Sequence, residues 1–468
     1  MKQRPVSAAI GFLIFTLMPL STFSSDCMAS SLTDTLNYRD SHDSNQLESD
    51  AQDFLLRNIR LIQQKQNLEL LQALQTQTES RRVVDASTSI LPSALKTLVL
   101  NASPADVQME ANYLSSTQYL LTGSAANGAL NDVYGAPTWV VPRENAMAIL
   151  GFIESAGITG DSSYLSKAQV AADYLVRVQD LSDGAWYDQY NYANPVSLSK
   201  SPTQTAEVMI AFKKLGFDAN RYASMKKGAQ YLMSLQNPAN KGGNDDGLIG
   251  GGKDASGNYS KYRWASDNSY AWLALNAAAS WAVSANDSAF AAQCNAAAAK
   301  IISGIDNYLY ISNTRDKDYG VWRRVIDDKH RTINPSFHEW INYAPQMLDI
   351  PAKGVGNVRV GEWIHKTFQK SDGSVVWNDG AQKSRKSPGY SFQAALVWYD
   401  LGQTAYADAA VNWSKNSGLW QKTPDANGIS GGWIDWAEVG QAAQWWERFI
   451  DTSFYSIAAF EGGYNFRS

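Results

Sequence analysis

The connections between helical segments alternate between short and long from residue 105 onward, and this alternation constrains the fold more than any other feature. Apolar residues recur at helical spacing in twelve segments, which are 105–122, 142–156, 162–179, 202–215, 219–236, 267–284, 286–309, 335–348, 357–370, 387–400, 404–416 and 437–458. Short joints such as 216–218 link the members of a pair. Long connections separate the pairs and end on helix-start signals such as Ser201-Pro202. The sequence therefore predicts six helical hairpins.

A short phrase also recurs where three of these helices end. In each copy a glutamine is followed by an Asp-Gly pair in the next loop: Gln179 with Asp183-Gly184, Gln236 with Asp246-Gly247, and Gln369 with Asp372-Gly373. One helical hairpin cannot bury its own apolar face, so such repeats must stack side by side, and six of them can close into a ring.

This pattern resembles the (α/α)6 toroid that many glycoside hydrolases and polysaccharide lyases share, over roughly residues 104–466. The stretch from Tyr174 to Trp186 is also similar to the Gln-Trp repeats of terpene cyclases, but the acidic Asp-x-Asp-Asp motif of those enzymes is absent here. The resemblance implies an all-α fold, an (α/α)6 toroid of six hairpins, over residues 104–468. It implies a carbohydrate as the partner.

The N-terminus has the order of a secretory signal peptide: basic residues, an apolar run over 6–20, then small polar residues. The run is interrupted by Pro19 and is shorter than the ~20 residues that a membrane span needs. We therefore expect a signal peptide over 1–29, export to the periplasm or the cell exterior, and no integral membrane segment after cleavage. A lipid anchor on Cys27 is less favoured. A lipobox has a leucine and then small residues before its cysteine, whereas Ser24, Ser25 and Asp26 precede Cys27.

Residues 30–103 are predicted to be a linker followed by a long amphipathic helix over 48–82, where leucines and isoleucines recur without glycine or proline. The simplest role for this helix is packing along the main domain. Self-association through it is the alternative.

Charge and metal-ligand content exclude two classes of partner. The net charge is −5 and no run of lysine and arginine is present, so a nucleic-acid partner is not expected. The two cysteines and four histidines are scattered without zinc-type spacing, so we expect no metal and no cofactor.

Candidate catalytic carboxylates lie at the predicted starts of the inner helices, which in such a toroid converge on one face. Glycoside hydrolysis needs two carboxyl groups, one protonated and one ionised. Asp267 and Glu339 are the first candidates, and Glu144, Glu207 and Asp435 are reserves. Helix capping is the alternative role for each of them.

The sequence neighbours suggest how the two first candidates divide the work. Phe337 and Trp340 flank Glu339, so we expect desolvation to raise its pKa and make it the acid. Asp267 lies among serine and asparagine, and we expect it to be the ionised partner.

Aromatic side chains beside carboxylates and amides indicate a carbohydrate site, because sugar C–H faces pack on rings while the hydroxyls bind polar groups. The alternative is that the tryptophans fill gaps between hairpins. The predicted substrate-binding residues are Trp186, Asp188, Tyr262, Arg263, Trp264, Asn268, His338, Trp340, Trp377, Tyr390 and Trp433.

Two other functions remain open. In a polysaccharide lyase or epimerase that acts on a uronic acid, Arg143 or Arg263 would neutralise the sugar carboxylate, and Tyr262, His338 or Tyr390 would take the neighbouring proton. A toroid with aromatic loops can also bind a glycan or a protein without catalysis.

Overall fold

The computed structural model describes residues 102–132, 139–236, 246–380, 383–434, 437–438 and 448–467. Contacts divide the chain into Met1–Leu91 and Pro92–Ser468, and all described residues belong to the second unit. The predicted signal peptide, the 48–82 helix and Asp435 lie outside the described residues. Within the described part, no helix has the length and apolar character to cross a bilayer.

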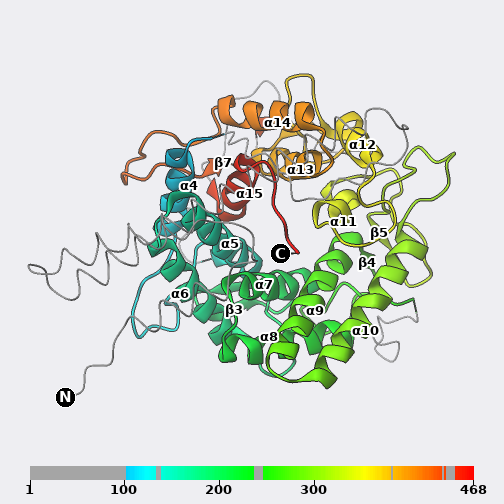
Figure 1. The fold of residues 1–468 in the computed structure, drawn as a ribbon, viewed down its shortest axis with the longest axis horizontal. Helices are drawn as coiled ribbons and strands as arrows, with labels where there is room; N and C mark the ends of the chain where they lie inside the picture. Colours follow the sequence, from blue (N-terminus) through cyan, green and yellow to red (C-terminus); the bar gives the residue numbers. More distant parts are fainter. Residues whose placement is uncertain are drawn as a thin grey trace, which may run out of the picture. The chain divides into compact units, whose positions relative to one another are not determined.

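Twelve α-helices of the described residues form two concentric rings (Figure 1). The inner ring consists of α5 (Pro142–Thr159), α7 (Pro202–Leu215), α9 (Ala265–Ser284), α11 (Ala344–Met347), α13 (Pro388–Asp400) and α15 (Ile450–Phe460). The outer ring consists of α4 (Pro104–Ser116), α6 (Ser163–Val178), α8 (Ala219–Leu235), α10 (Ser288–Gly304), α12 (Val358–Phe368) and α14 (Thr404–Asn416). Each inner helix packs on the next, and α15 packs on α5, which closes the ring. The predicted (α/α)6 toroid is confirmed.

Burial separates the two rings in the way their positions require. The inner helix α7 buries every residue from Pro202 through Phe212, because neighbours surround it on all sides. The outer helix α12 buries Val360, Trp363, Ile364 and Phe368, which lie three or four residues apart on one face. The apolar core therefore lies between the rings and inside the inner one.

Local signals explain most helix starts. The Ser201 hydroxyl accepts a hydrogen bond from the backbone N–H of Gln204, and Pro202 occupies the first turn of α7. The Ser387 hydroxyl accepts from the N–H of Tyr390 in α13 in the same way. Both starts agree with the sequence prediction.

The recurring Gln…Asp-Gly phrase joins neighbouring outer helices. Gln179 Nε2 donates to the carbonyl of Gly184 in its own loop (2.7 Å) and to that of Ser224 in α8 (2.9 Å). Gln236 and Gln369 make the corresponding pairs of bonds, to Gly247 with Ala297 in α10 and to Gly373 with Tyr406 in α14. The repeat is thus a device that holds successive hairpins side by side.

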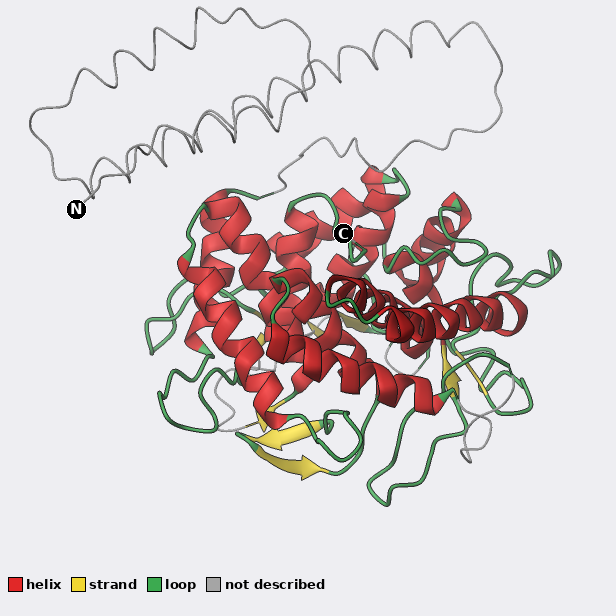
Figure 2. Cartoon of the chain, turned by 60° about the horizontal axis from the view of Figure 1, so that its bottom comes forward, coloured by secondary structure: helices red, strands yellow, loops and turns green. Residues whose placement is uncertain are grey.

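Short antiparallel strands gather at one end of the helices (Figure 2). They are β1 (Trp139–Val140) with β2 (Gln189–Asn191) and β3 (Asn194–Ser197), β4 (Arg263–Trp264) with β5 (Val325–Ile326), β6 (Arg385–Lys386) with β8 (Ala437–Glu438), and β7 (Trp433–Ile434) with β9 (Arg448–Phe449). A strand ends within five residues of the start of each inner helix except α11, so the inner helices begin on the strand side of the ring.

Three predicted helices differ from the structure. The segment 437–458 contains strands at Ala437–Glu438 and Arg448–Phe449, which pair with β6 and β7, so α15 begins only at Ile450. The segment 335–348 is helical from residue 340, as the 3₁₀-helix η2 (Trp340–Tyr343) followed by α11. The first helix ends at Ser116 rather than 122, where Thr117 bonds back to the Leu114 carbonyl. A π-helix, η1 (Ile305–Leu309), extends α10.

Candidate functional site

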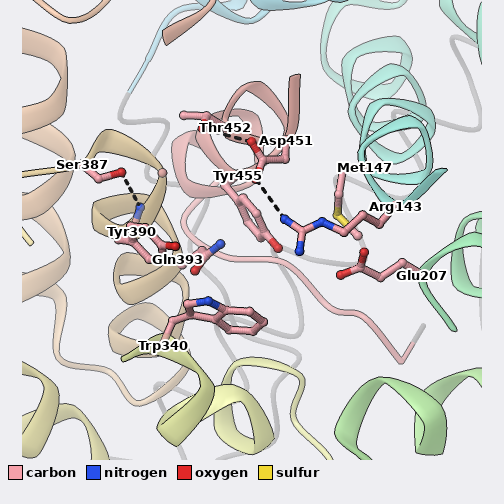
Figure 3. Close-up of a pocket in the computed structure, with 11 residues that line it drawn as sticks. Arg143, Met147, Glu207, Trp340, Ser387, Tyr390, Gln393, Asp451, Thr452 and Tyr455 are labelled. Carbon is pink, nitrogen blue, oxygen red and sulfur yellow. Dashed lines mark hydrogen bonds and ion pairs between the residues drawn. The ribbon is translucent and has the colours of Figure 1, made fainter. Parts of the chain in front are cut away.

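The starts of five inner-ring elements line a cavity of about 60 Å³ at the strand side of the toroid (Figure 3). The lining residues are Arg143 and Met147 from α5, Glu207 from α7, Trp340 from η2, Ser387, Gly389, Tyr390 and Gln393 from α13, and Asp451, Thr452 and Tyr455 from α15. Positive helix N-terminal ends converge here, which favours carboxylates at these positions.

Arg143 joins three of the helix starts. Its Nε lies 2.7 Å from Glu144 Oε1, and its Nη2 lies 4.0 Å from Asp451 Oδ2. Its backbone N–H donates to Gln204 Oε1 of α7 at 2.7 Å. The neighbouring carboxylates, Glu144 first and then Glu207 and Asp451, raise the pKa of the Arg143 guanidinium well above its usual value. This side chain is therefore a fixed positive charge, and 38% of it is exposed at the cavity.

Glu207 is the cavity carboxyl with the features of an acid. Its residue is 3% exposed, and among the described residues its Oε2 has no hydrogen-bond partner. Burial raises its pKa to about 7, although Arg143 and the Tyr270 hydroxyl act in the opposite direction. A carboxyl group in this setting holds a proton near neutral pH and can give it to a bound molecule.

Asp451 is the second carboxyl that lines the cavity. Burial raises its pKa, and Arg143 is the largest influence that lowers it. Glu144, the other partner of Arg143, is also a buried carboxyl whose pKa burial raises, but it does not line the cavity. Glu207 and Asp451 thus face the same space from α7 and α15 (Figure 3).

Asp267 lies near this group, in a setting opposite to the predicted one. Its Oδ1 accepts a hydrogen bond from the Thr203 hydroxyl at 2.6 Å, and the residue is 9% exposed. Burial, with a smaller contribution from the charge of Asp188, raises its pKa to about 7, although the Thr203 hydrogen bond acts in the opposite direction. The serines and the asparagine beside it are buried as well, so the predicted polar, fully ionised setting is wrong, and Asp267 keeps a proton up to about pH 7.

Glu339 is likewise placed differently from the prediction. It begins η2, and its Oε1 accepts from Arg324 Nη1 at 2.8 Å. Arg324 packs over the rings of Trp264 and Phe337, at 5.0 and 4.6 Å from their centres. The aromatic neighbours thus hold an arginine against Glu339 and do not form the apolar pocket that the sequence suggested.

Several predicted substrate-binding residues lie at or near the cavity. Trp340 and Tyr390 line it, and the ring of Trp377 lies 5.7 Å from that of Tyr390, between centres. Asp188 and Trp264 are partly exposed on the same side of the ring, and Tyr262 is 38% exposed.

Four others are fully buried against protein groups. Trp186 Nε1 donates to the Leu175 carbonyl, and Trp433 stacks on Trp420 with ring centres 4.7 Å apart. Arg263 pairs with Asp246 at 2.9 Å. Asn268 accepts from the N–H of Ile249 and donates to the Trp264 carbonyl. The packing alternative fits these four residues.

His338 is buried between two carboxylates. Its Nδ1 lies 2.5 Å from Asp379 Oδ2, and its Nε2 lies 2.9 Å from Asp318 Oδ2. Both ring nitrogens are therefore occupied. The interactions fix the segment that carries Glu339 and Trp340, and they leave no nitrogen to act as a base.

Sequence reasoning missed Asp451 and Tyr455 as site residues. The predicted helix 437–458 placed both well inside a helix, whereas the strand pairing of residues 448–449 makes them the first turns of α15. The Asp451-Thr452 pair is a helix-start signal that the sequence did contain.

No cluster of three or more histidine, cysteine, aspartate or glutamate side chains among the described residues is arranged to hold a metal ion. The cavity is lined by carboxyl groups, one arginine, an amide, hydroxyl groups, a methionine and aromatic rings.

Solved structures similar to this chain share its fold. A cellobiose 2-epimerase from Bacillus thermoamylovorans matches with a TM-score of 0.57 at 10% identity, over 76% of this chain and 97% of its own. A D-mannose isomerase matches with a TM-score of 0.56 at 12% identity, over 80% of this chain and 98% of its own. An alpha-amylase from Clostridium perfringens matches with a TM-score of 0.52 at 13% identity, over 78% of this chain and 99% of its own. No protein-family model and no curated protein matches the chain. The chain thus has the (α/α)6 toroid fold that these glycosidase-like enzymes share.

Proposed function

We propose that this protein is a carbohydrate-active enzyme, a glycoside hydrolase in which Glu207 is the general acid. The observation that carries the proposal is the position of Glu207: a buried carboxyl group with a pKa of about 7 that opens on the cavity where the inner helices begin. The glycosidases, epimerase and isomerase with the same fold support a sugar as the substrate.

Asp451 is the proposed second carboxylate. Glu207 donates its proton to the glycosidic oxygen as the bond to the leaving sugar breaks. Positive charge develops on the sugar ring, and the Asp451 carboxylate stabilises it, as nucleophile or by activating water. Arg143 favours the ionised form of Asp451. Trp340 and Tyr390 line the space in which the sugar ring would lie.

The pair Asp267 and Glu339 is the second assignment for the same reaction, with the roles exchanged from those the sequence suggested. Asp267 has a pKa of about 7, and Glu339 is paired with Arg324. The reserve candidates Glu144 and Asp435 complete the set to be tested. Replacing each with its amide, one at a time, identifies the pair, because only the reacting carboxyls lower kcat strongly.

Lyase or epimerase chemistry has less support from the site. Arg143 and Tyr390 line the cavity and are the lyase candidates that remain. Arg263 is buried in its pair with Asp246, and His338 has both nitrogens bonded. None of the three histidines in the described part of the chain lines the cavity. Burial also raises the pKa of the Tyr455 hydroxyl, which makes it a poor base.

A substrate panel tests the proposed function. The purified protein is incubated with neutral and uronic-acid polysaccharides while reducing ends and the ultraviolet absorbance of a new C=C bond are followed together. Hydrolysis gives reducing ends without absorbance. A rise in both signals means β-elimination, and silence in both with retained glycan binding means a binding protein; either result rejects the hydrolase.

We also propose that the enzyme is exported, on the strength of the N-terminal pattern alone. Cell fractionation followed by N-terminal sequencing of the mature protein tests this. A cytoplasmic chain that still carries residues 1–29 would contradict it.

A further inference from the structure

The solvent face of the three-stranded sheet carries an exposed tryptophan in line with two amides. Trp139 pairs with Asn191, and Asn191 pairs with Asn194, so the three residues form one row across β1, β2 and β3. Trp139 is 55% exposed, and both asparagines are exposed. Directly opposite residues in such a row have their Cβ atoms about 5 Å apart. On the other face of the sheet, Val140 and Tyr190 are buried.

The hairpin that carries the two asparagines is firmly held. The Tyr190 hydroxyl donates to the Val178 carbonyl at the end of α6, at 2.8 Å. The Tyr174 hydroxyl donates to the carbonyl of Tyr192 at the hairpin turn, and the Tyr192 ring packs edge-on against Tyr119. The row is therefore a preorganised surface, so a ligand would bind it at little cost in ordering.

The backbone of the row is linked to segments that line the cavity. Trp139 lies four residues before Arg143, which limits the distance between their backbones to about 14 Å. The backbone N–H of Asp132 donates to the Trp139 carbonyl, and the backbone carbonyl of Asp132 accepts from the N–H of Ile450, next to Asp451. At the other end of the sheet, Asp188 accepts from the N–H of Ser201, at the start of α7.

We propose that this row binds sugar units of a polysaccharide chain whose scissile bond lies in the cavity. The flat ring of Trp139 offers a face for sugar C–H groups, and the neighbouring amides offer donors and acceptors for hydroxyls. Val196, the exposed residue at the bulge of β3, adds apolar surface beside the row, and the row carries no charge. An exposed apolar patch rimmed by polar groups marks an interaction site. The inference rests on the proposed function and names its substrate as a polymer rather than a free mono- or disaccharide.

Affinity electrophoresis of the full chain tests the proposal. The Glu207→Gln protein, which would not consume its ligand, is run through gels that contain soluble starch, xylan, galactomannan or polygalacturonate. At least one polysaccharide is expected to retard it. Adding Trp139→Ala should lower that affinity about tenfold, whereas Trp139→Phe should keep most of it, because a ring remains. Phe217→Ala is the matched control: Phe217 is 50% exposed but follows the end of α7, on the opposite side of the ring.

Equal retardation with and without the Trp139 ring would overturn the proposal. A result in which none of the four polysaccharides retards the protein would overturn it as well. If Trp139→Ala does not fold, Asn191→Ala with Asn194→Ala replaces it, with the same expected loss of affinity. If retardation depends on Trp139 but the wild type releases no reducing ends, the proposal of a sugar-binding row stands. Only the proposal that the protein is a hydrolase is then rejected.

Discussion

Glu110 and Glu207 show why a raised pKa alone does not define a catalytic group. Both carboxyls are buried, and burial raises the pKa of each to about 7. Glu110, on α4, accepts hydrogen bonds from Trp420 Nε1 at 2.7 Å and from the Gly432 N–H at 3.0 Å, so it joins the first helix of the ring to the loop after α14. Only Glu207 opens on the cavity.

The Glu110 carboxyl makes stability depend on pH. Its pKa is about 7 in the folded protein and near 4.5 when exposed, so its contribution is complete below pH 4.5 and is lost as pH rises through 7. Between pH 5 and pH 8, the wild type should therefore lose up to about 3 kcal/mol more unfolding free energy than Glu110→Gln. Urea unfolding of both proteins at the two pH values measures this. An identical loss in both would contradict the assigned pKa.

The chemical types of the site residues were predictable from the sequence, but their protonation states were not. Carboxylates at the inner helix starts, including Glu207, were recognisable from position alone. The burial that raises the pKa of Asp267 and the pairing of Glu339 with Arg324 both come from other segments of the chain. Neighbours in sequence do not report such tertiary partners.

At the scale of the elements, local signals predicted helices where the partners are local. Ser201-Pro202 and Ser387-Pro388 begin helices as expected, because the cap is made within the first turn. The prediction for 335–348 was wrong at its start, where Glu339 forms an isolated β-bridge with Asn378. The prediction for 437–458 was wrong because strands there pair with distant segments. Glu438 lies opposite Arg385, and Phe449 lies opposite Trp433.

The Asp-Gly phrase between hairpins gives a sharp prediction. Gly184 has φ +84°, and a Cβ there would lie 2.4 Å from the backbone carbonyl of Lys227 in α8. Gly184→Ala should therefore cost about 2 to 4 kcal/mol, from backbone strain and from the displaced helix. Gly160, with φ +74° and no atom near such a Cβ, is the matched control and should cost about 1 kcal/mol. Equal urea midpoints for the two variants would show that the phrase does not join the hairpins.

The two carboxylates that hold His338 give a prediction for the segment before η2. His338→Asn cannot reach both Asp318 and Asp379, so the segment that ends in Trp340 should loosen. Breaking a buried pair of this kind costs about 3 kcal/mol. We expect a higher KM with a smaller change in kcat, because His338 positions a cavity wall and does not react. A loss confined to kcat would indicate a direct chemical role.

The whole ring is closed by its first and last helices. α15 packs on both α4 and α5, so the end of the chain completes the wall that begins near residue 104. The contacts separate the unit Pro92–Ser468 from the residues before it. A protein that begins at Pro92 should therefore fold and keep the thermal midpoint and turnover of the mature chain. A truncated chain that fails to fold would show that the preceding residues belong to the ring.

Ring topology was predictable because it follows from the alternation of connections, which is a property of the entire chain. The cavity was not, because it depends on where α15 begins, and only the pairing of β7 with β9 places Asp451 and Tyr455 there. An error in one predicted helix boundary therefore leaves the predicted architecture unchanged, but it changes which residues are predicted to line the site.

Turnover by Glu207→Gln, on whichever polysaccharide the wild type cleaves, tests the central claim most directly. We expect kcat to fall about 10²- to 10⁴-fold, because the amide has no proton to donate, while the glycan is still bound. Glu110→Gln, which removes a carboxyl of the same raised pKa outside the cavity, should keep wild-type kcat. Wild-type turnover should also decline as pH rises through about 7, where Glu207 loses its proton. Near-wild-type turnover by Glu207→Gln would contradict the account.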